Sequence, residues 1–421
     1  MKRKNLLFLL VAAIVVMGML TQCGATPTPV VVEKTVVVNQ TVEVPKEVVV
    51  QQTVEVPVEK QVVVTATPVP VVEPSKEIVF QDNQSGSNFQ QWFQTIALPA
   101  AEKATGIKIN YVVGKDAEIF EKMKAWEPGK GDFAVLFPKS AAALIKSEIP
   151  VEILSPDKIP NMAKVDPKLQ TSSEGVPIED KAVAYWFSTY ALVWNSDLVK
   201  DPPETWAEFY DRRAEFKGQI GFIRPDAKSS AGWRQPFAFL NAFYDFSKPF
   251  DPNDPEFQAA WEKLKDFYTY ATLPLAAEPS PNLFENFNAG DTAISVYAMD
   301  YTLWSAREGT MPPTMKAGFL KEGIDAGGQA YFAVPANISD ADKLAAYQVI
   351  NFLLSDEMQV RLVSTMWQYN STLVNDQVPP IVWEQIPPPD VAWSVKIPAE
   401  RVNADAIQYI KDHGLELVPP E

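Results

Sequence analysis

The residue types that support catalysis or metal binding are scarce in this sequence. It contains one histidine, His413, and one cysteine, Cys23. A zinc site needs a group of His or Cys ligands. A Ser/His/Asp triad would have to use His413, which lies in a Lys-Asp-His-Gly stretch typical of a helix end. Acidic residues are numerous enough for a glycosidase, but no nucleophile or acid motif accompanies them. The sequence therefore favours binding over catalysis, and we expect neither a metal nor a cofactor.

Polar and aromatic side chains are instead placed where they can contact a small molecule. Asp82 and Ser85 follow a short apolar run at residues 78–80, and Lys139 and Ser140 follow a similar run. Ser85 also precedes a helical pattern, where capping is the commoner role, and Lys139 argues against a purely cationic ligand. Aromatic faces stack on sugars or bases and attract cations, although with 11 tryptophans in the chain a core position is the alternative for them. The predicted ligand-binding residues are Asp82, Ser85, Ser140, Trp186, Tyr190, Trp233, Asp300 and Tyr301.

Strands that alternate with helices must position these side chains. Residues 78–80, 108–113 and 133–137 are typical of short strands, and helical patterns lie between them. This alternation predicts an α/β fold with parallel βαβ units. Such sheets bind ligands at the carboxyl ends of their strands. We therefore expect the loops after the first and third of these strands to lie on one rim.

The N-terminus has the pattern of an export signal. Basic residues in Met1–Lys4 precede an apolar run at 6–20, which is short for a membrane-spanning helix. The following Thr21-Gln22-Cys23 resembles a bacterial lipobox, with Gln22 in place of the usual small residue. We expect residues 1–22 to be a signal peptide and Cys23 to be lipidated; an uncleaved membrane anchor is the alternative.

Residues 23–75 form a low-complexity segment rich in valine and proline. Residues 34–45 and 46–57 are near-identical repeats, and a partial third copy follows. The segment has no aromatic residue with which to build a core, so we expect an extended stalk. The chain as a whole carries a net charge of −16. Such a surface repels phosphate backbones and disfavours nucleic-acid binding.

From Glu77 to Thr372 the sequence resembles the type II periplasmic substrate-binding proteins, in the group near the polyamine, iron and thiamine binders. The motifs that carry the resemblance occur in the same order along both chains. They are 98–113 with its Thr-Gly-Ile turn, 190–195 followed by 202–206, 216–222, 288–296, 330–335, and the Ile-Asn-Phe-Leu-Leu-Ser segment at 350–359. Within the group, the overall run is most similar to the YnjB-like binding proteins.

This resemblance implies a two-lobed fold with lobes joined by two crossover strands. We expect 76–188 plus 300–352 in lobe 1 and 189–299 plus 353–421 in lobe 2. The crossings would lie near Trp186–Tyr190 and Met299–Tyr301. Two crossovers form a hinge that lets the lobes close on a ligand.

The implied function is that of a substrate-binding lipoprotein of an ABC importer. It would be exported, membrane-anchored and monomeric, and its partners would be a small polar solute and the permease subunits. No enzymatic activity is expected. The alternatives are a sensory or adhesive surface protein of the same fold and, less favoured, a secreted glycosidase.

Overall fold

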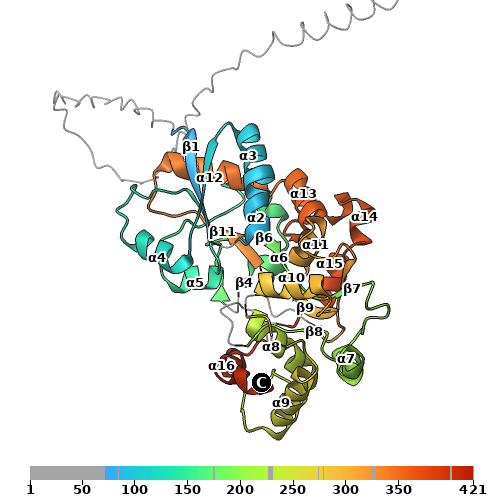
Figure 1. Ribbon diagram of the computed structural model, residues 1–421. Coiled ribbons are helices and arrows are strands. Elements are labelled where there is room, and N and C mark those ends of the chain that lie inside the picture. The colour runs from blue at the N-terminus through green and yellow to red at the C-terminus, as the bar shows by residue number, and fades with distance from the viewer. Residues whose placement is uncertain are drawn as a thin grey trace, which may run out of the picture. The chain divides into compact units, whose positions relative to one another are not determined.

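The computed structural model of the protein describes residues 72–83, 85–173, 176–225, 231–273, 275–277, 279–323, 329–398 and 401–420. The chain divides into two compact units, and all of these residues belong to the second unit, Val69–Glu421. Figure 1 shows this unit in colour. The predicted signal peptide, the lipidation of Cys23 and most of the predicted stalk lie outside the described residues. At the end of the predicted stalk, Ser75 binds α12 (Asp340–Leu353): its N–H donates to the Ala341 carbonyl (3.0 Å) and its hydroxyl to Asp342 (2.6 Å).

The first sheet is parallel and has the strand order β2-β1-β3. Its strands are β1 (Glu77–Asp82), β2 (Lys108–Val113) and β3 (Val135–Phe137). The helices that connect them are α2 (Ser87–Trp92), α3 (Leu98–Thr105) and α4 (Asp116–Lys124), and α5 (Ala141–Lys146) follows β3. In Figure 1, α2 and α3 lie to one side of β1, and α4 and α5 lie to the other. The predicted parallel βαβ units are confirmed.

The Thr-Gly-Ile turn between α3 and β2 has a specific backbone requirement. Gly106 ends α3 with a φ of 70°, in the left-handed region. A side chain is disfavoured there, whereas glycine adopts this conformation without penalty. The turn returns the chain to the sheet, where Lys108 pairs with Glu77 at the start of β1.

The second sheet, of order β11-β6-β12, is antiparallel. It contains β6 (Val183–Phe187), β11 (Gln329–Phe332) and β12 (Tyr369–Asn370). All five residues of β6 are buried. A bridge between Leu136 of β3 and Ala333, which follows β11, joins this sheet to the first one through two hydrogen bonds of 2.9 and 2.8 Å.

The third sheet has the order β10-β7-β9-β8. Its strands are β7 (Tyr190–Asn195), β8 (Ile220–Gly221), β9 (Ile294–Ala298) and β10 (Met315–Gly318). The chain leaves the second sheet at Phe187 and enters the third at Tyr190, within the region predicted for the first crossing.

The return from the third sheet occurs later than the sequence suggested. The predicted position was Met299–Tyr301, where α11 (Met299–Arg307) begins. After α11 the chain forms β10, which pairs with β7 in the third sheet. The chain re-enters the second sheet only at the next strand, β11. The edge of the third sheet still has room for a strand beside β7, and β10 takes that place.

The remaining helices pack around the three sheets. They are α6 (Pro167–Gln170), α7 (Trp206–Asp211), α8 (Ala231–Phe243), α9 (Pro255–Tyr268), α10 (Pro279–Ala289), α13 (Asp356–Met366), α14 (Pro380–Trp383), α15 (Pro389–Ser394) and α16 (Ala404–His413). Short 3-10 helices span Pro160–Lys164, Arg213–Phe216, Asn375–Gln377 and Gly414–Leu417, a π-helical turn spans Phe93–Ala97, and β4 (Ser172–Ser173) pairs with β5 (Val176–Pro177).

Two hydrophobic clusters underlie these elements. One is built around β1, β3, β6, β11, α12 and α13, and the other around α7, α8 and α9. Aromatic rings dominate the second cluster: Trp206 stacks on Phe209 at 5.9 Å between ring centroids, and Phe209 meets Phe267 edge-on at 5.0 Å. Large buried rings supply much of the apolar area that stabilises such clusters.

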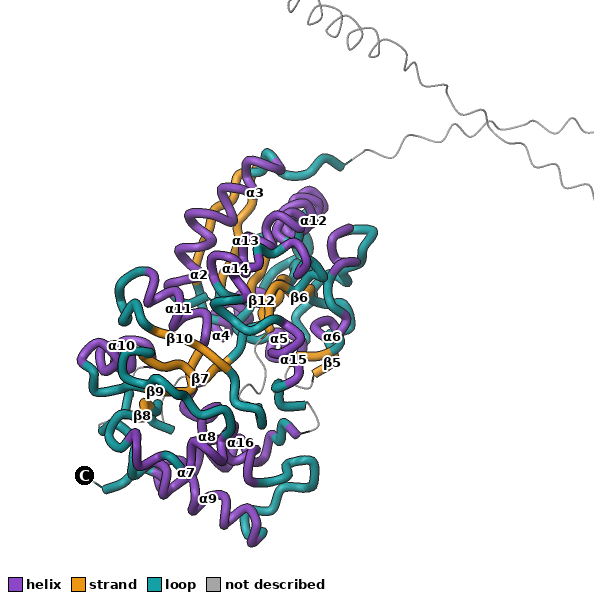
Figure 2. Tube along the Cα trace, turned by 90° about the vertical axis from the view of Figure 1, so that its right-hand side faces the viewer, coloured by secondary structure: helices purple, strands orange, loops and turns teal. Residues whose placement is uncertain are grey.

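The C-terminal region contributes to both clusters in turn. Val382, Ile386 and Ala392 pack in the first cluster, whereas Ala406 and Ile410 of α16 pack in the second. Figure 2 shows α16 beside α8, and these helices are in contact. This distribution differs from the predicted division, which placed everything after residue 352 in lobe 2. Because the region runs back across both sheets, its amphipathic helices bury their apolar faces in both places.

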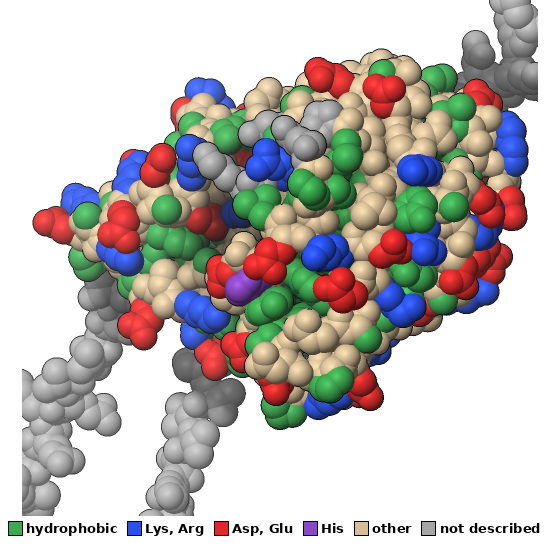
Figure 3. Space-filling model, turned by 60° about the horizontal axis from the view of Figure 1, so that its bottom comes forward, with side chains coloured by type: hydrophobic (Ala, Val, Ile, Leu, Met, Phe, Trp, Pro, Cys, Tyr) green, Lys and Arg blue, Asp and Glu red, His purple; other side chains and the backbone are tan. Residues whose placement is uncertain are grey.

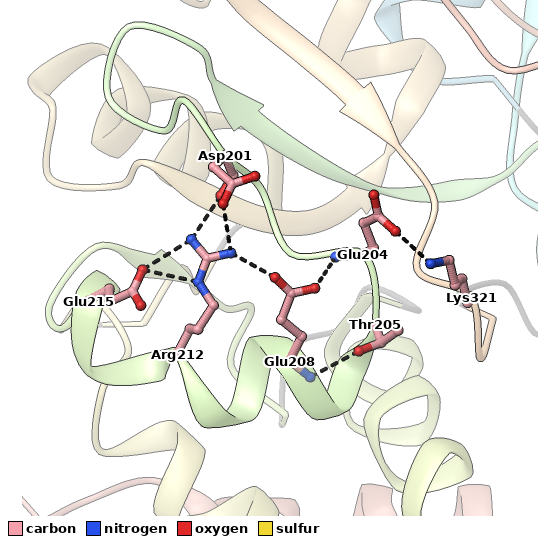
Figure 4. A network of polar contacts seen from close by, with 7 residues as sticks. All are labelled: Asp201, Glu204, Thr205, Glu208, Arg212, Glu215 and Lys321. Carbon is pink, nitrogen blue, oxygen red and sulfur yellow. Dashed lines mark hydrogen bonds and ion pairs between the residues drawn. The ribbon is translucent and has the colours of Figure 1, made fainter.

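A polar network holds α7 and the loop before it (Figure 4). Arg212 is at its centre and forms ion pairs with Glu208 (2.8 Å), Glu215 (3.0 Å) and Asp201 (3.5 Å). Thr205 caps α7 by accepting a hydrogen bond of 2.9 Å from the Glu208 N–H. These contacts connect the loop after β7 to the second cluster.

Candidate functional site

Asp82 organises the loop that follows β1. It is the last residue of the strand and is 0% exposed. Its Oδ1 accepts from the Ser85 N–H at 3.0 Å, and its Oδ2 accepts from the Tyr111 hydroxyl at 2.5 Å. Burial, together with the adjacent Asp82 charge, raises the pKa of Tyr111, so its hydroxyl remains a donor. Both oxygens of Asp82 therefore have structural donors.

Ser85 does not take the capping role that was the alternative for it, and its contact with a ligand stays a prediction. Its carbonyl accepts from the Gln90 side chain at 3.0 Å, which ties the loop to the start of α2. Its hydroxyl is buried and has no hydrogen-bond partner among the residues that the structure describes. It does not cap α2, whose N-cap is Gly86. A buried hydroxyl of this kind gains free energy when a polar group reaches it.

A second acid, Asp116, fixes the loop after β3. Its carboxylate accepts from the N–H groups of Lys139 (3.0 Å) and Ser140 (3.1 Å), and from the Asn83 side chain (3.1 Å). Burial raises the pKa of Asp116, and these hydrogen bonds oppose the rise. Asp116 thus joins the loops after β1 and β3 at one edge of the sheet.

Ser140 begins α5. Its Oγ accepts from the Ala143 N–H at 3.0 Å, which is the geometry of a helix cap. The hydroxyl proton remains available to donate elsewhere. A capping role accounts for the serine at this position, and contact with a ligand stays a prediction.

Trp186 lies in the core and does not line a surface. Its ring is 1% exposed, stacks on Phe89 at 4.2 Å and meets Phe137 edge-on at 4.9 Å. The ring is enclosed by aromatic neighbours because β6 is the central strand of the second sheet. Its packing corresponds to the core role weighed above as the alternative, and it presents no face to a solute in this conformation.

The rings of Tyr190 and Trp233 both adjoin the guanidinium of Arg234. Tyr190 begins β7, directly after the crossing, while Trp233 and Arg234 lie in the first turn of α8. The Arg234 guanidinium lies 5.4 Å from the Tyr190 ring centroid and 5.2 Å from that of Trp233. All three side chains are half-buried. A cation held between two aromatic rings is oriented by their electron-rich faces.

Gln235 holds this end of α8 in place. Its side chain is fully buried, accepts from the Ile223 N–H at 2.8 Å and donates to the Val296 carbonyl at 2.5 Å. It therefore fastens the helix to the third sheet next to Arg234. Gly232 permits the close approach, since a Cβ there would lie 2.7 Å from the Arg224 carbonyl oxygen.

Asp300 and Tyr301 lie at the start of α11, where they meet the start of α2. Asn88 donates to the Asp300 carboxylate at 3.3 Å, and the hydroxyls of Ser87 and Tyr301 lie 2.9 Å apart. Asp300 is 5% exposed, and burial raises its pKa to about 7. These contacts join the helix after β9, in the third sheet, to the helix after β1, in the first.

The structure thus divides the predicted site residues into smaller groups. Asp82, Ser85 and Ser140 share the edge of the first sheet, and Asp300 with Tyr301 adjoins α2. Tyr190 and Trp233 share Arg234. A chain of ring contacts connects the last two groups, through Tyr190–Tyr297 (5.9 Å), Tyr297–Phe284 (6.1 Å) and Phe284–Tyr301 (5.2 Å).

Sequence reasoning missed Asp116, Asn88 and Arg234. Asp116 had a usable signal, since an acid at the first position of a helix after a parallel strand commonly binds nearby N–H groups. Asn88 had none, because its partner Asp300 is 212 residues away. Arg234 is adjacent to the predicted Trp233, but its proximity to Tyr190 depends on how α8 packs.

None of the helices in the described part of the chain has the length and apolar character that crossing a bilayer requires. Within the same ranges, no three His, Cys, Asp or Glu side chains come together in a way that could hold a metal ion.

Comparison with known proteins identifies the family. Residues 97–385 match the family model described as bacterial extracellular solute-binding protein. A search of curated proteins found no match.

Solved structures share the fold at low sequence identity. A putative spermidine/putrescine ABC transporter from Listeria monocytogenes has a TM-score of 0.55 and 19% identity, over 82% of this chain and 99% of that one. A putative extracellular solute-binding protein from Bordetella parapertussis has a TM-score of 0.61 and 15% identity, over 82% and 99%. Iron-bound HitA from Pseudomonas aeruginosa has a TM-score of 0.56 and 18% identity, over 81% and 100%.

These comparisons confirm the type II periplasmic-binding-protein fold and leave the YnjB-like subgroup as a prediction. Extracellular location is a property of the matched family, so export agrees with it. This chain belongs to the bacterial extracellular solute-binding proteins.

Proposed function

We propose that this protein captures a small polar solute between two lobes and delivers it to the membrane permease of an ABC importer, without catalysing a reaction. The observation that carries the proposal is the passage of the chain from β6 to β7 between two sheets, with its return at β11. A solute held beside such a crossing can contact both sides, and the lobes can then close by small changes in the connecting segments.

We place the solute at the loops after β1 and β3, the start of α8 and the start of α11. Of the predicted residues, Asp82, Ser85, Ser140, Trp233, Asp300 and Tyr301 lie in or next to these segments, and Tyr190, at the start of β7, adjoins Arg234 of α8. Ser85 supports this choice most directly, because its buried hydroxyl has no partner in the described part of the chain.

We also propose a revised division into lobes. Lobe 1 would contain the first and second sheets with α12 to α15, and lobe 2 would contain the third sheet with α7 to α10 and α16. The helices α7, α8, α9 and α16 pack in the second cluster and α12 to α15 in the first, which supports this division; the third sheet contributes side chains to both clusters, and α10 packs in the first. Residues 1–22 would be removed as a signal peptide, and Cys23 would carry a lipid that attaches the stalk and lobes to the membrane.

The decisive experiment is native mass spectrometry of the purified protein, followed by calorimetric titration with the solute that it carries. We expect one small solute per chain and a smaller radius of gyration in X-ray scattering when the solute is bound. A protein that carries no solute, and whose scattering is unchanged by every candidate solute, would refute the proposal.

A further inference from the structure

Lys139 presents a cation from the first sheet. It follows β3, and its backbone is fixed because Asp116 accepts from the N–H groups of both Lys139 and Ser140. Its side chain keeps exposed surface. The residue therefore has a rigid base and an ammonium group that can reach a solute at the edge of the sheet.

Arg234 presents a second cation from the third sheet. Gln235 fastens α8 to Ile223 and Val296, while the rings of Tyr190 and Trp233 adjoin the guanidinium. A guanidinium supplies five N–H donors in a plane that matches the oxygens of a carboxylate or a phosphate.

The two cations are near enough to influence each other. Although the Lys139 side chain keeps exposed surface, desolvation by the protein around it is the main cause that lowers its pKa, and the positive charge of Arg234 is the next. The charges of Asp116 and Asp82 oppose this effect. Two cations from different sheets repel each other, and an anion between them would relieve the repulsion.

Among the residues that the structure describes, the acids of the loops after β1 and β3 and of the start of α11 are already engaged by the protein. Asp82 accepts from Tyr111 and Ser85, and Asp116 accepts from two backbone N–H groups and from Asn83. Asp300 is buried and, with a pKa of about 7, is partly protonated at neutral pH. Recognition of a polyamine would require carboxylates that face the solute, whereas these carboxylates position the loops.

The distribution of charge on the face that Figure 3 shows does not select for a positively charged solute either. Figure 3 shows basic side chains interspersed with acidic ones on one face, so the net charge of −16 does not make that face uniformly acidic.

We propose that the solute carries an oxyanion group, a carboxylate or a phosphate, and that Lys139 and Arg234 bind this group from the two sides of the crossing. This inference rests on the proposed solute-binding function and specifies the chemical class of the solute. Contact with both cations would also draw the two lobes together, so recognition of the anion and closure would be one event.

The test is isothermal titration of the purified protein with inorganic phosphate, succinate, spermidine and glucose. We expect phosphate or succinate to bind, more weakly as ionic strength rises; which of them binds distinguishes a phosphate solute from a carboxylate one. Lys139→Gln and Arg234→Gln should each raise the Kd by about 10- to 100-fold, as for a lost hydrogen bond to a charged group. Lys146→Gln, on α5, and Lys265→Gln, on α9, remove exposed cations of the same lobes and should leave the Kd unchanged.

Circular dichroism of each variant separates a lost contact from a lost fold. Binding of spermidine or glucose without binding of either oxyanion would overturn the oxyanion inference and leave the solute-binding function intact. Oxyanion binding that is insensitive to both Lys139→Gln and Arg234→Gln would overturn it as well. If none of the four solutes binds, the solute that the purified protein carries decides: a solute without an acidic group refutes the inference, and one with an acidic group is then titrated against the same variants.

Discussion

At the scale of single residues, Asp300 shows how burial changes the chemistry of a side chain. It lies at the junction of α11 and α2, and its pKa is raised to about 7, mainly by burial. An unfolded chain would ionise this carboxyl near a pH of about 4. Between these two values the folded protein retains a proton that the unfolded chain releases.

The pH dependence of stability follows from this difference. The contribution of Asp300 is fully present below a pH of about 4 and is lost as the pH rises toward 7, because the unfolded state then binds fewer protons. We expect the stability of Asp300→Asn relative to the wild type to be greater at pH 8 than at pH 5, by on the order of 1–4 kcal/mol. Urea denaturation of both proteins at the two pH values measures this.

Asp356 provides a matched control, because its pKa is shifted in the opposite direction to that of Asp300. Lys164 lowers the pKa of Asp356 through an ion pair of 2.6 Å, so the contribution of Asp356 is present at neutral pH and is lost as the pH falls. Asp356→Asn should therefore reduce stability at pH 8 more than in acid. An Asp300→Asn variant with the same pH profile as the wild type would show that this carboxyl does not titrate as described.

Tyr111 is expected to stabilise the loop after β1. Tyr111→Phe removes the donor of the 2.5 Å hydrogen bond to the fully buried Asp82. Loss of a partner for a buried charged group should lower the free energy of unfolding by about 1–3 kcal/mol. Tyr210→Phe removes a similar bond of 3.0 Å to the part-exposed Asp266 and should cost less. Equal losses in thermal denaturation would contradict a special role for the Asp82 contact.

At the scale of elements, sequence patterns identified strands more reliably than they identified side-chain contacts. The predicted strand at 108–113 matches β2 in full, and the 133–137 run contains β3. Alternating strands and helices leave few topologies open, because parallel strands need a crossover connection. The position of the return crossing could not be derived in this way, because β10 joins an edge that forms only when the third sheet is assembled.

The network around Arg212 allows a test at this scale. Arg212→Met removes ion pairs to Glu208, Glu215 and Asp201 and a hydrogen bond of 2.9 Å to the Asp201 carbonyl. We expect a loss of about 1–2 kcal/mol in urea denaturation, and a smaller loss at high salt, because the network is partly exposed. Lys321→Met breaks one well-exposed pair with Glu204 and should cost much less. Indistinguishable variants would mean that the network does not act cooperatively.

At the scale of the whole unit, the C-terminal region connects the two hydrophobic clusters. It passes from α15, where Trp393 packs on Phe187 at 4.7 Å, to Arg401, which donates to the Asn241 and Tyr244 carbonyls at 2.9 Å. Beyond the two crossings in the sheets, this path is a third connection between the clusters. A third connection restricts the ways in which the two sides can move relative to each other.

Truncation of Ile410 tests the contribution of α16 to the second cluster. Ile410 is fully buried, so Ile410→Ala should lower the free energy of unfolding by about 2–5 kcal/mol. Ile381→Ala, on the exposed face of α14, should change it by less than about 0.5 kcal/mol. Chemical denaturation followed by tryptophan fluorescence gives both values. A near-neutral Ile410→Ala would mean that α16 is dispensable for the cluster.

The class of this protein can be read from its amino-acid sequence without a structure. Alternating apolar strands and helices and the glycine of the Thr-Gly-Ile turn depend on local periodicity and backbone geometry, and the ordered motifs rest on resemblance to a known family. None of these requires knowledge of a distant contact. The same is true of the scarcity of histidine and cysteine, which follows from composition alone.

Which side chains meet, in contrast, depends on the folded molecule. Trp186 and Trp233 are both predicted from the sequence to contact a solute, yet one is enclosed by Phe89 and Phe137 and the other adjoins Arg234. The contact between Asn88 and Asp300 joins residues 212 positions apart. Contacts of this kind depend on how sheets and helices pack, and packing is a property of the assembled chain that no local pattern specifies.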